Sequence, residues 1–140
     1  MAITRTELQQ IAEIRLADAE ALLAAERWAG AYYLLGYVCE CALKASILAG
    51  FGPQEIPDKK LANDFYTHRL DGLLKISPIG PTLESRVKTD GAFRNSWNTV
   101  SDWGEASRYR PEIGEDEARS LYVAITDEKS GLFTWLKPRC

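Results

Sequence analysis

The chain contains a single histidine, so proton transfer near neutral pH would depend on His68. Nothing in the sequence places a cysteine beside it for nucleophilic catalysis. The sequence also has no Gly-rich phosphate loop, no GxSxG motif and no paired histidines that could hold a metal. A lone histidine in the first turn of a helix is more typical of a structural or capping residue. These patterns predict no catalytic residues, no metal site and no cofactor.

The three cysteines are Cys39, Cys41 and Cys140. Residues two apart on a helix point about 200° away from each other, so Cys39 and Cys41 could neither pair nor share a metal. An odd number of cysteines without a CxxC motif predicts reduced thiols in a cytoplasmic protein. The segment MAITRTELQQ has no apolar run of the kind that signal peptides contain.

Two arginines and a phenol are adjacent at a turn near residue 110: Arg108, Tyr109 and Arg110. Arginine binds phosphate through two parallel hydrogen bonds and stacks on aromatic rings, so this segment is the best candidate for an anion site. The alternative is that the arginines pair with nearby carboxylates and orient the last helix. The partners would then be Glu112, Glu115 or Asp116.

Arg94 and Asn95 form a second polar pair that could bind phosphate. The alternative for Arg94 is an ion pair with Asp90, which lies four residues earlier on the same helix face.

A polar stripe runs along an otherwise apolar helix at residues 28–50, and it contains Tyr33, Tyr37, Glu40 and Lys44. The intervals of four, three and four put these residues on one face. The stripe could line a ligand cleft or an interface between subunits. It could equally be a surface ion pair worth about 0.3–0.5 kcal/mol.

The composition is that of an ordinary globular protein, with 46% hydrophobic and 26% charged residues. A net charge of −3 gives no general attraction to nucleic acid or anionic lipid. At 140 residues the chain fits one domain, residues 1–140. The apolar segment 28–49 is long enough to cross a membrane, but Glu40 and Lys44 in its middle favour a buried core helix and no membrane association.

Apolar periodicity predicts an all-α fold, an up-and-down bundle of four long helices and one short helix. The first two helices cover residues 6–27, with Thr6 as N-cap, and 28–50. A loop is expected over 51–66. The short helix follows, with Thr67 as N-cap and an end at Ser77-Pro78, and 77–82 form a second loop.

The fourth helix is expected over 82–104, weakened in its middle by Gly91. An ordered turn over 104–114 leads to the last helix, which begins at the acidic run from Glu115 and continues to the C-terminus through Gly131.

Three segments in this order resemble the HEPN family (higher eukaryotes and prokaryotes nucleotide-binding). The first is YYLLGYVCECALKASILAG in the central helix, and the second is THRLDGLL. The third is Trp103 followed by Arg108-Tyr109 and Pro111, which is similar to the family's Arg-Tyr-Pro junction before the last helix. The resemblance covers about residues 8–137, and it implies a helical bundle that acts on or binds nucleotides.

One group in this family consists of metal-independent ribonucleases, often toxins, whose signature is Arg-x(4–6)-His. Arg94-Asn95 is similar to its beginning, but the histidine would fall on Thr99, Val100 or Ser101. His68 would need an arginine at 61, 62 or 63, where the chain has Leu61, Ala62 and Asn63. Hydroxyl groups cannot replace imidazole in this proton transfer. The resemblance is therefore better to the second group, binding modules that accompany nucleotidyltransferases.

Three hypotheses follow. The first is a binding module for a nucleotide, a phosphate or a protein partner, with Arg94, Asn95, Arg108, Tyr109 and Arg110 as the binding residues. It would be a homodimer or would dock on a nucleotidyltransferase-type protein, and its polar stripe and His68 would lie at the interface or cleft. The second is a divergent toxin-like ribonuclease that uses Arg94, Asn95 and His68, with RNA as substrate. The third is a structural or antitoxin-like subunit. A dimer is favoured by four tryptophans at core-like spacing. It is also favoured by the apolar central helix, which one layer of neighbouring helices would not easily cover.

Overall fold

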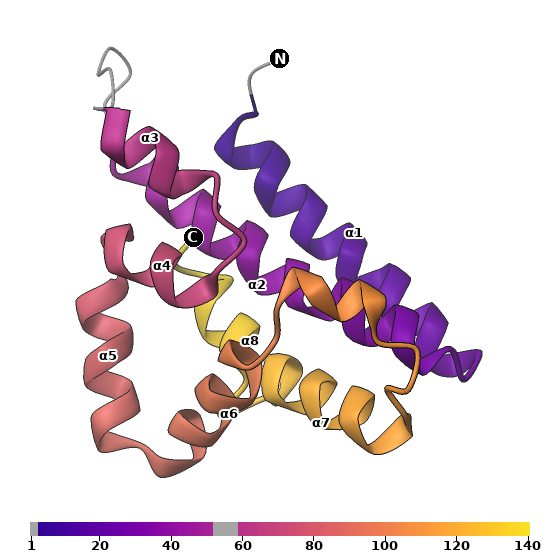
Figure 1. Ribbon diagram of the computed structural model, residues 1–140. Helices are drawn as coiled ribbons and strands as arrows, with labels where there is room; N and C mark the ends of the chain where they lie inside the picture. Colours follow the sequence, from indigo (N-terminus) through magenta and orange to yellow (C-terminus); the bar gives the residue numbers. More distant parts are fainter. Residues whose placement is uncertain (1–2, 52–58) are drawn as a thin grey trace.

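The computed structural model describes residues 3–51 and 59–140, with side chains in the second range from Ala62 onward. Every regular element in this part of the chain is helical, as the sequence predicts. Figure 1 shows the two longest helices side by side, with the remaining helices packed along one side of this pair.

The pair consists of α1 (Arg5–Ala24) and α2 (Trp28–Ala49), which run antiparallel (Figure 1). Thr4 is the N-cap of α1, because its hydroxyl accepts a hydrogen bond from the backbone nitrogen of Glu7 at 3.1 Å. The prediction that Thr6 is the N-cap was therefore wrong by two residues. The helix also ends before Arg27, because Glu26 adopts a left-handed backbone conformation with φ of 59°.

α2 is the central helix, as its apolar circumference predicts. It contacts α1 and the helical segments 70–76, 105–109, 115–126 and 132–136, and most of its side chains from Ala31 to Ile47 are buried. Its most apolar window is long enough to span a membrane, and 78% of that window is buried within the protein. Because the fold of one chain covers α2, an uncovered central helix is no longer a reason to expect a dimer.

The segment 51–66 was predicted to be a loop. This prediction was wrong for residues 59–65, which form the helix α3 (Lys59–Phe65), and residues 52–58 lie outside the described part. α4 (Leu70–Ile76) ends before Ser77-Pro78, as predicted. Its N-cap is Arg69 and not Thr67. The Thr67 hydroxyl instead accepts a hydrogen bond from the backbone nitrogen of Arg69 at 3.2 Å and stabilises the turn that precedes the helix.

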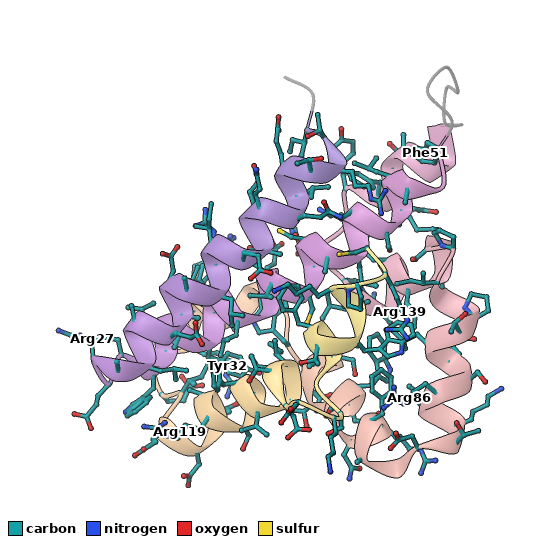
Figure 2. All side chains as sticks on the ribbon, turned by 180° about the vertical axis from the view of Figure 1, so that it is seen from behind. Arg27, Tyr32, Phe51, Arg86, Arg119 and Arg139 are labelled. Atoms are coloured by element: carbon teal, nitrogen blue, oxygen red, sulfur yellow. The ribbon has the colours of Figure 1, made fainter. Side chains whose placement is uncertain are left out.

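The predicted helix over 82–104 is two helices, α5 (Gly80–Thr89) and α6 (Gly91–Ser101). The break is at Asp90, next to the weak point expected at Gly91, and the backbone of Asp90 is extended. One carboxylate oxygen of Asp90 accepts a hydrogen bond from the backbone nitrogen of Phe93, and the other accepts one from Arg86. Arg86, which Figure 2 labels, also lies over the Phe93 ring and so joins α5 to α6. The loop expected over 77–82 is shorter, because α5 begins at Gly80 with Pro81 in its first turn.

The chain then forms the 3₁₀ helix η1 (Glu105–Tyr109), α7 (Glu115–Thr126) and α8 (Leu132–Leu136). The last helix is therefore interrupted, in contrast to the prediction. The Asp127 carboxylate accepts hydrogen bonds from the backbone nitrogens of Lys129 and Ser130, which favours a turn over a helix. A side chain at Gly131 would touch the backbone of Asp127 and of Ile125, so this tight turn needs glycine. The described residues thus form two long and six shorter α-helices rather than four long helices and one short helix.

Candidate functional site

The polar stripe of α2 is built from two contacting pairs. The hydroxyls of Tyr33 and Tyr37 lie 3.2 Å apart, and their rings meet edge to face. One turn further along the helix, the Lys44 ammonium lies 3.5 Å from the Glu40 carboxylate. Both members of this ion pair are buried, which excludes the interpretation of the stripe as a solvent-exposed surface pair.

His68 joins this stripe to two other elements. Its Nδ1 atom lies 3.0 Å from Oε1 of Glu40, and its Nε2 atom lies 3.2 Å from Oε2 of Glu105 at the start of η1. A neutral imidazole has only one N–H, so both contacts to ionised carboxylates are hydrogen bonds only when the ring is an imidazolium. We call this arrangement the His68 bridge. It connects α2, the segment that precedes α4, and η1.

Trp103 lies against the polar stripe and is 4% exposed. Its indole N–H donates a hydrogen bond to the backbone oxygen of Tyr32 at 3.0 Å. The indole ring meets the Tyr37 ring edge to face at 5.0 Å and lies directly on Gly36, where a larger residue would overlap it. The close approach of η1 to α2 thus requires a glycine in the middle of α2.

A cleft of about 600 Å³ opens beside the His68 bridge, between the start of α4 and the end of α6. We call it the His68 cleft. It combines three aromatic rings with hydroxyl groups and charged groups of both signs. The residues that define it are Tyr66, Thr67, His68, Arg69, Asp71, Trp97, Ser101, Trp103 and Glu105.

Two of the residues predicted to bind phosphate lie away from this cleft, on α6. Arg94 donates hydrogen bonds to the backbone oxygens of Val87 at 2.9 Å and Lys88 at 3.0 Å. It therefore caps the C-terminal end of α5, while Asp90 pairs with Arg86 instead of Arg94. Asn95 lines a separate, shallow groove between α6 and α7.

The other predicted arginines differ in their partners. Arg110 pairs with Glu112 at 2.9 Å and with Glu117 of α7 at 3.1 Å. It therefore pairs with nearby carboxylates, as the alternative interpretation predicted. Glu117 was not among the predicted partners. Arg108 lies over the ring of Tyr109, and hydrogen bonding with Tyr109 and then with Tyr33 raises the pKa of its guanidinium. Arg94, Arg108 and Arg110 thus share no contact, and only Arg108 lies beside the polar stripe.

The cysteines are free and buried. Burial raises the pKa of the Cys39 thiol strongly, and burial with the nearby Glu40 carboxylate raises the pKa of Cys41 to about 11. Neither thiol is therefore available as a nucleophile. In the described part of the chain, no three His, Cys, Asp or Glu side chains gather closely enough to hold a metal ion.

His68 and the polar stripe are recognisable from the sequence, but the residues that complete the site around them are not. Glu105 was not singled out, because no spacing rule relates it to His68 on a different element. Gly36 was a usable signal, since glycine inside an apolar helix indicates close contact with a neighbouring group. Arg69, Asp71 and Lys75, on and next to α4, carried no pattern that would distinguish them from ordinary surface charges.

Comparison of the chain with protein-family models, with curated proteins and with solved structures found no match. The grounds for a functional proposal are therefore the geometry of the His68 cleft and the chemistry of the side chains around it.

Proposed function

We propose that this chain is a HEPN-like binding module that holds a nucleotide in the His68 cleft. The observation that carries the proposal is the His68 bridge, since it fixes η1 and the segment before α4 on either side of an open, aromatic-lined cleft. A cleft that is fixed before its ligand arrives loses little conformational entropy on binding.

The side chains around the cleft suit the parts of a nucleotide. The rings of Trp97 and Tyr66 offer faces on which a base can stack, with the buried Trp103 ring behind them. The hydroxyls of Thr67 and Ser101 can donate or accept hydrogen bonds. Arg69 supplies a guanidinium that can bind phosphate oxygens.

We further propose that the module works in a complex, either as a homodimer or with a nucleotidyltransferase-type protein. The exposed side chains of Ile14 on α1 and Val123 on α7 support this part of the proposal. Sedimentation of the purified chain, alone and with such a partner, tests it. A single monomeric species in both samples would contradict it.

Titration calorimetry with nucleotides tests the binding function. Ser101 lines the cleft at the end of α6, so Ser101→Phe should fill the cleft and lower nucleotide affinity at least tenfold. The matched control is Asn98→Phe, which adds the same ring one turn earlier on an exposed part of α6 and should leave affinity unchanged. Equal affinities for wild type and Ser101→Phe, or no binding by the wild type, would refute the proposal.

The second candidate function is the divergent ribonuclease, and one contact favours it. Buried Glu40 contacts Nδ1 of His68, which is how a carboxylate orients a catalytic imidazole, and Nε2 points to Glu105, a residue that lines the cleft. The Arg94 guanidinium is not placed for this chemistry, because carbonyl oxygens of α5 hold it. RNA incubated with the protein and a chelator separates the two functions. If wild type cleaves RNA and His68→Gln does not, the ribonuclease is favoured. If Arg94→Ala also abolishes cleavage, the arginine predicted from the sequence takes part in the reaction.

A further inference from the structure

The His68 cleft shares three lining residues with a second cleft, which is lined by the C-terminal part of α4. This second cleft has a volume of about 560 Å³, and we call it the Lys75 cleft. Its lining includes Asn63, Asp64 and Lys75, and it shares Thr67, Arg69 and Asp71 with the His68 cleft. We call the three shared residues the divide between the two clefts.

We infer that a nucleoside 5′-phosphate lies across this divide, with its base in the His68 cleft, its ribose at Asp71 and its phosphate between Arg69 and Lys75. This inference rests on the proposed function and adds to it the direction in which the ligand lies and the groups that recognise the phosphate.

The divide can accept a ligand because its charged groups are exposed and weakly held. Arg69 and Asp71 form an ion pair at 3.2 Å, and their side chains are 79% and 52% exposed. Exposed pairs of this kind contribute little to stability, so the guanidinium can turn to a phosphate at little cost. The hydrogen bond from Arg69 lowers the pKa of Asp71, which keeps this carboxylate ionised and able to accept hydrogen bonds from ribose hydroxyls.

Lys75 supplies the second positive charge of the phosphate site. It lies four residues after Asp71 on α4, so both side chains project from the same face of the helix. None of the ion pairs found among the described side chains includes Lys75, although the carboxylates of Asp64 and Asp71 line the same cleft. Arg69 on the divide and Lys75 in the Lys75 cleft therefore provide two cations for the phosphate.

The base can occupy only the His68 cleft, because its stacking surfaces are there. Trp97 and Tyr66 line this cleft, whereas the Lys75 cleft is lined by polar side chains and by Ile76. Arg108 is the competing cation for the phosphate. It lies on η1 beside Tyr33, outside the lining of both clefts, and would draw the phosphate toward η1 instead of α4.

Calorimetric titrations with adenosine, AMP and inorganic phosphate test the inference, with adenine chosen because a purine has a large stacking face. We expect wild type to bind AMP at least tenfold more tightly than adenosine. Lys75→Gln should lose this preference while its affinity for adenosine stays the same. Arg108→Gln removes one positive charge from η1 and should keep the preference. Lys75 and Arg108 are both exposed, so both variants are expected to fold, and circular dichroism checks this.

Three results would overturn the inference. If Arg108→Gln loses the preference for AMP and Lys75→Gln keeps it, the phosphate lies at η1, and the proposed nucleotide-binding function survives. If inorganic phosphate binds but adenosine does not compete with AMP, the base has no site in the His68 cleft. If wild type binds neither adenosine nor AMP, the proposed function fails as well.

Discussion

Substitution of Gly36 by alanine should show how tightly η1 is held against the central helix. Gly36 lies in the middle of α2, beneath the Trp103 ring, and a Cβ atom there would overlap three carbon atoms of the indole. The ring cannot move aside easily, because it is buried and its N–H is bonded to the backbone oxygen of Tyr32. The added methyl group therefore has to displace Trp103 or push η1 away from α2.

Two opposing effects determine the change in the free energy of unfolding. Glycine to alanine inside a helix stabilises by about 1 kcal/mol through backbone entropy. Overpacking a core costs about 1–3 kcal/mol. Full expulsion of a tryptophan costs about 3–5 kcal/mol, comparable to its deletion. Because the overlap involves the centre of a fixed ring, we expect a result between these limits. Once the helix gain of about 1 kcal/mol is subtracted, this is a net loss of about 2 kcal/mol and a fall in Tm of about 5–10 °C.

Urea denaturation followed by circular dichroism measures this loss. Gly30→Ala is the matched control, since Gly30 is on the same helix and a Cβ there would meet only Leu22 Cδ1 at an ordinary 3.5 Å. The control should be as stable as wild type or slightly more stable. If Gly36→Ala proved as stable as Gly30→Ala, Trp103 would not pack on α2 as described, and the back wall of the His68 cleft would have to be reconsidered.

Three further predictions concern buried and charged groups. Glu40→Ala leaves the Lys44 ammonium buried without its partner and should lower the free energy of unfolding by about 3 kcal/mol, measured by urea denaturation. Adding Lys44→Met should restore part of this loss, and a double variant that shows the sum of the two single losses would contradict the prediction. The pKa of Asp90 is lowered, first by the hydrogen bond from the backbone of Phe93 and then by Arg86. Asp90→Ala should therefore be less stable than wild type at neutral pH, and this difference should shrink as the pH falls below about 4. A stability difference that does not change with pH would contradict the prediction. With a pKa of about 11, only about 0.1% of Cys41 is thiolate at pH 8, so iodoacetamide should label this cysteine only when the protein unfolds. Rapid labelling of Cys41 in the folded protein would contradict its burial.

The sequence was most informative where one strong pattern covers many residues. The apolar circumference of 28–50 predicted the central helix almost to the residue, because burial on all sides leaves few polar positions. Proline after Ser77 predicted the end of α4 for an equally local reason, since the residue before a proline disfavours helix.

Prediction failed where a side chain competes with the helix for backbone hydrogen bonds. Asp90 and Asp127 both lie inside apolar patterns that continue on either side, so periodicity alone gave single long helices. In the structure their carboxylates accept backbone N–H groups of the next residues and stop the helix. Aspartate is common on helix surfaces too, and only the packing of the following segment decides which role it takes. The weak point at Gly91 was recognised, but a glycine alone does not distinguish a strained helix from a broken one.

The break at Asp90 also explains why the arginine expected to bind phosphate does not reach the cleft. In an uninterrupted helix, the carbonyl oxygens of Val87 and Lys88 would accept hydrogen bonds from residues 91 and 92. Because the chain turns at Asp90, those oxygens lose their helical partners, and the Arg94 guanidinium donates to them instead. The same turn therefore ends α5 and commits Arg94 to capping it. In the proposed nucleotide site, the cation therefore comes from elements beside the His68 bridge, with Arg69 and Lys75 as the proposed groups and Arg108 as the competitor.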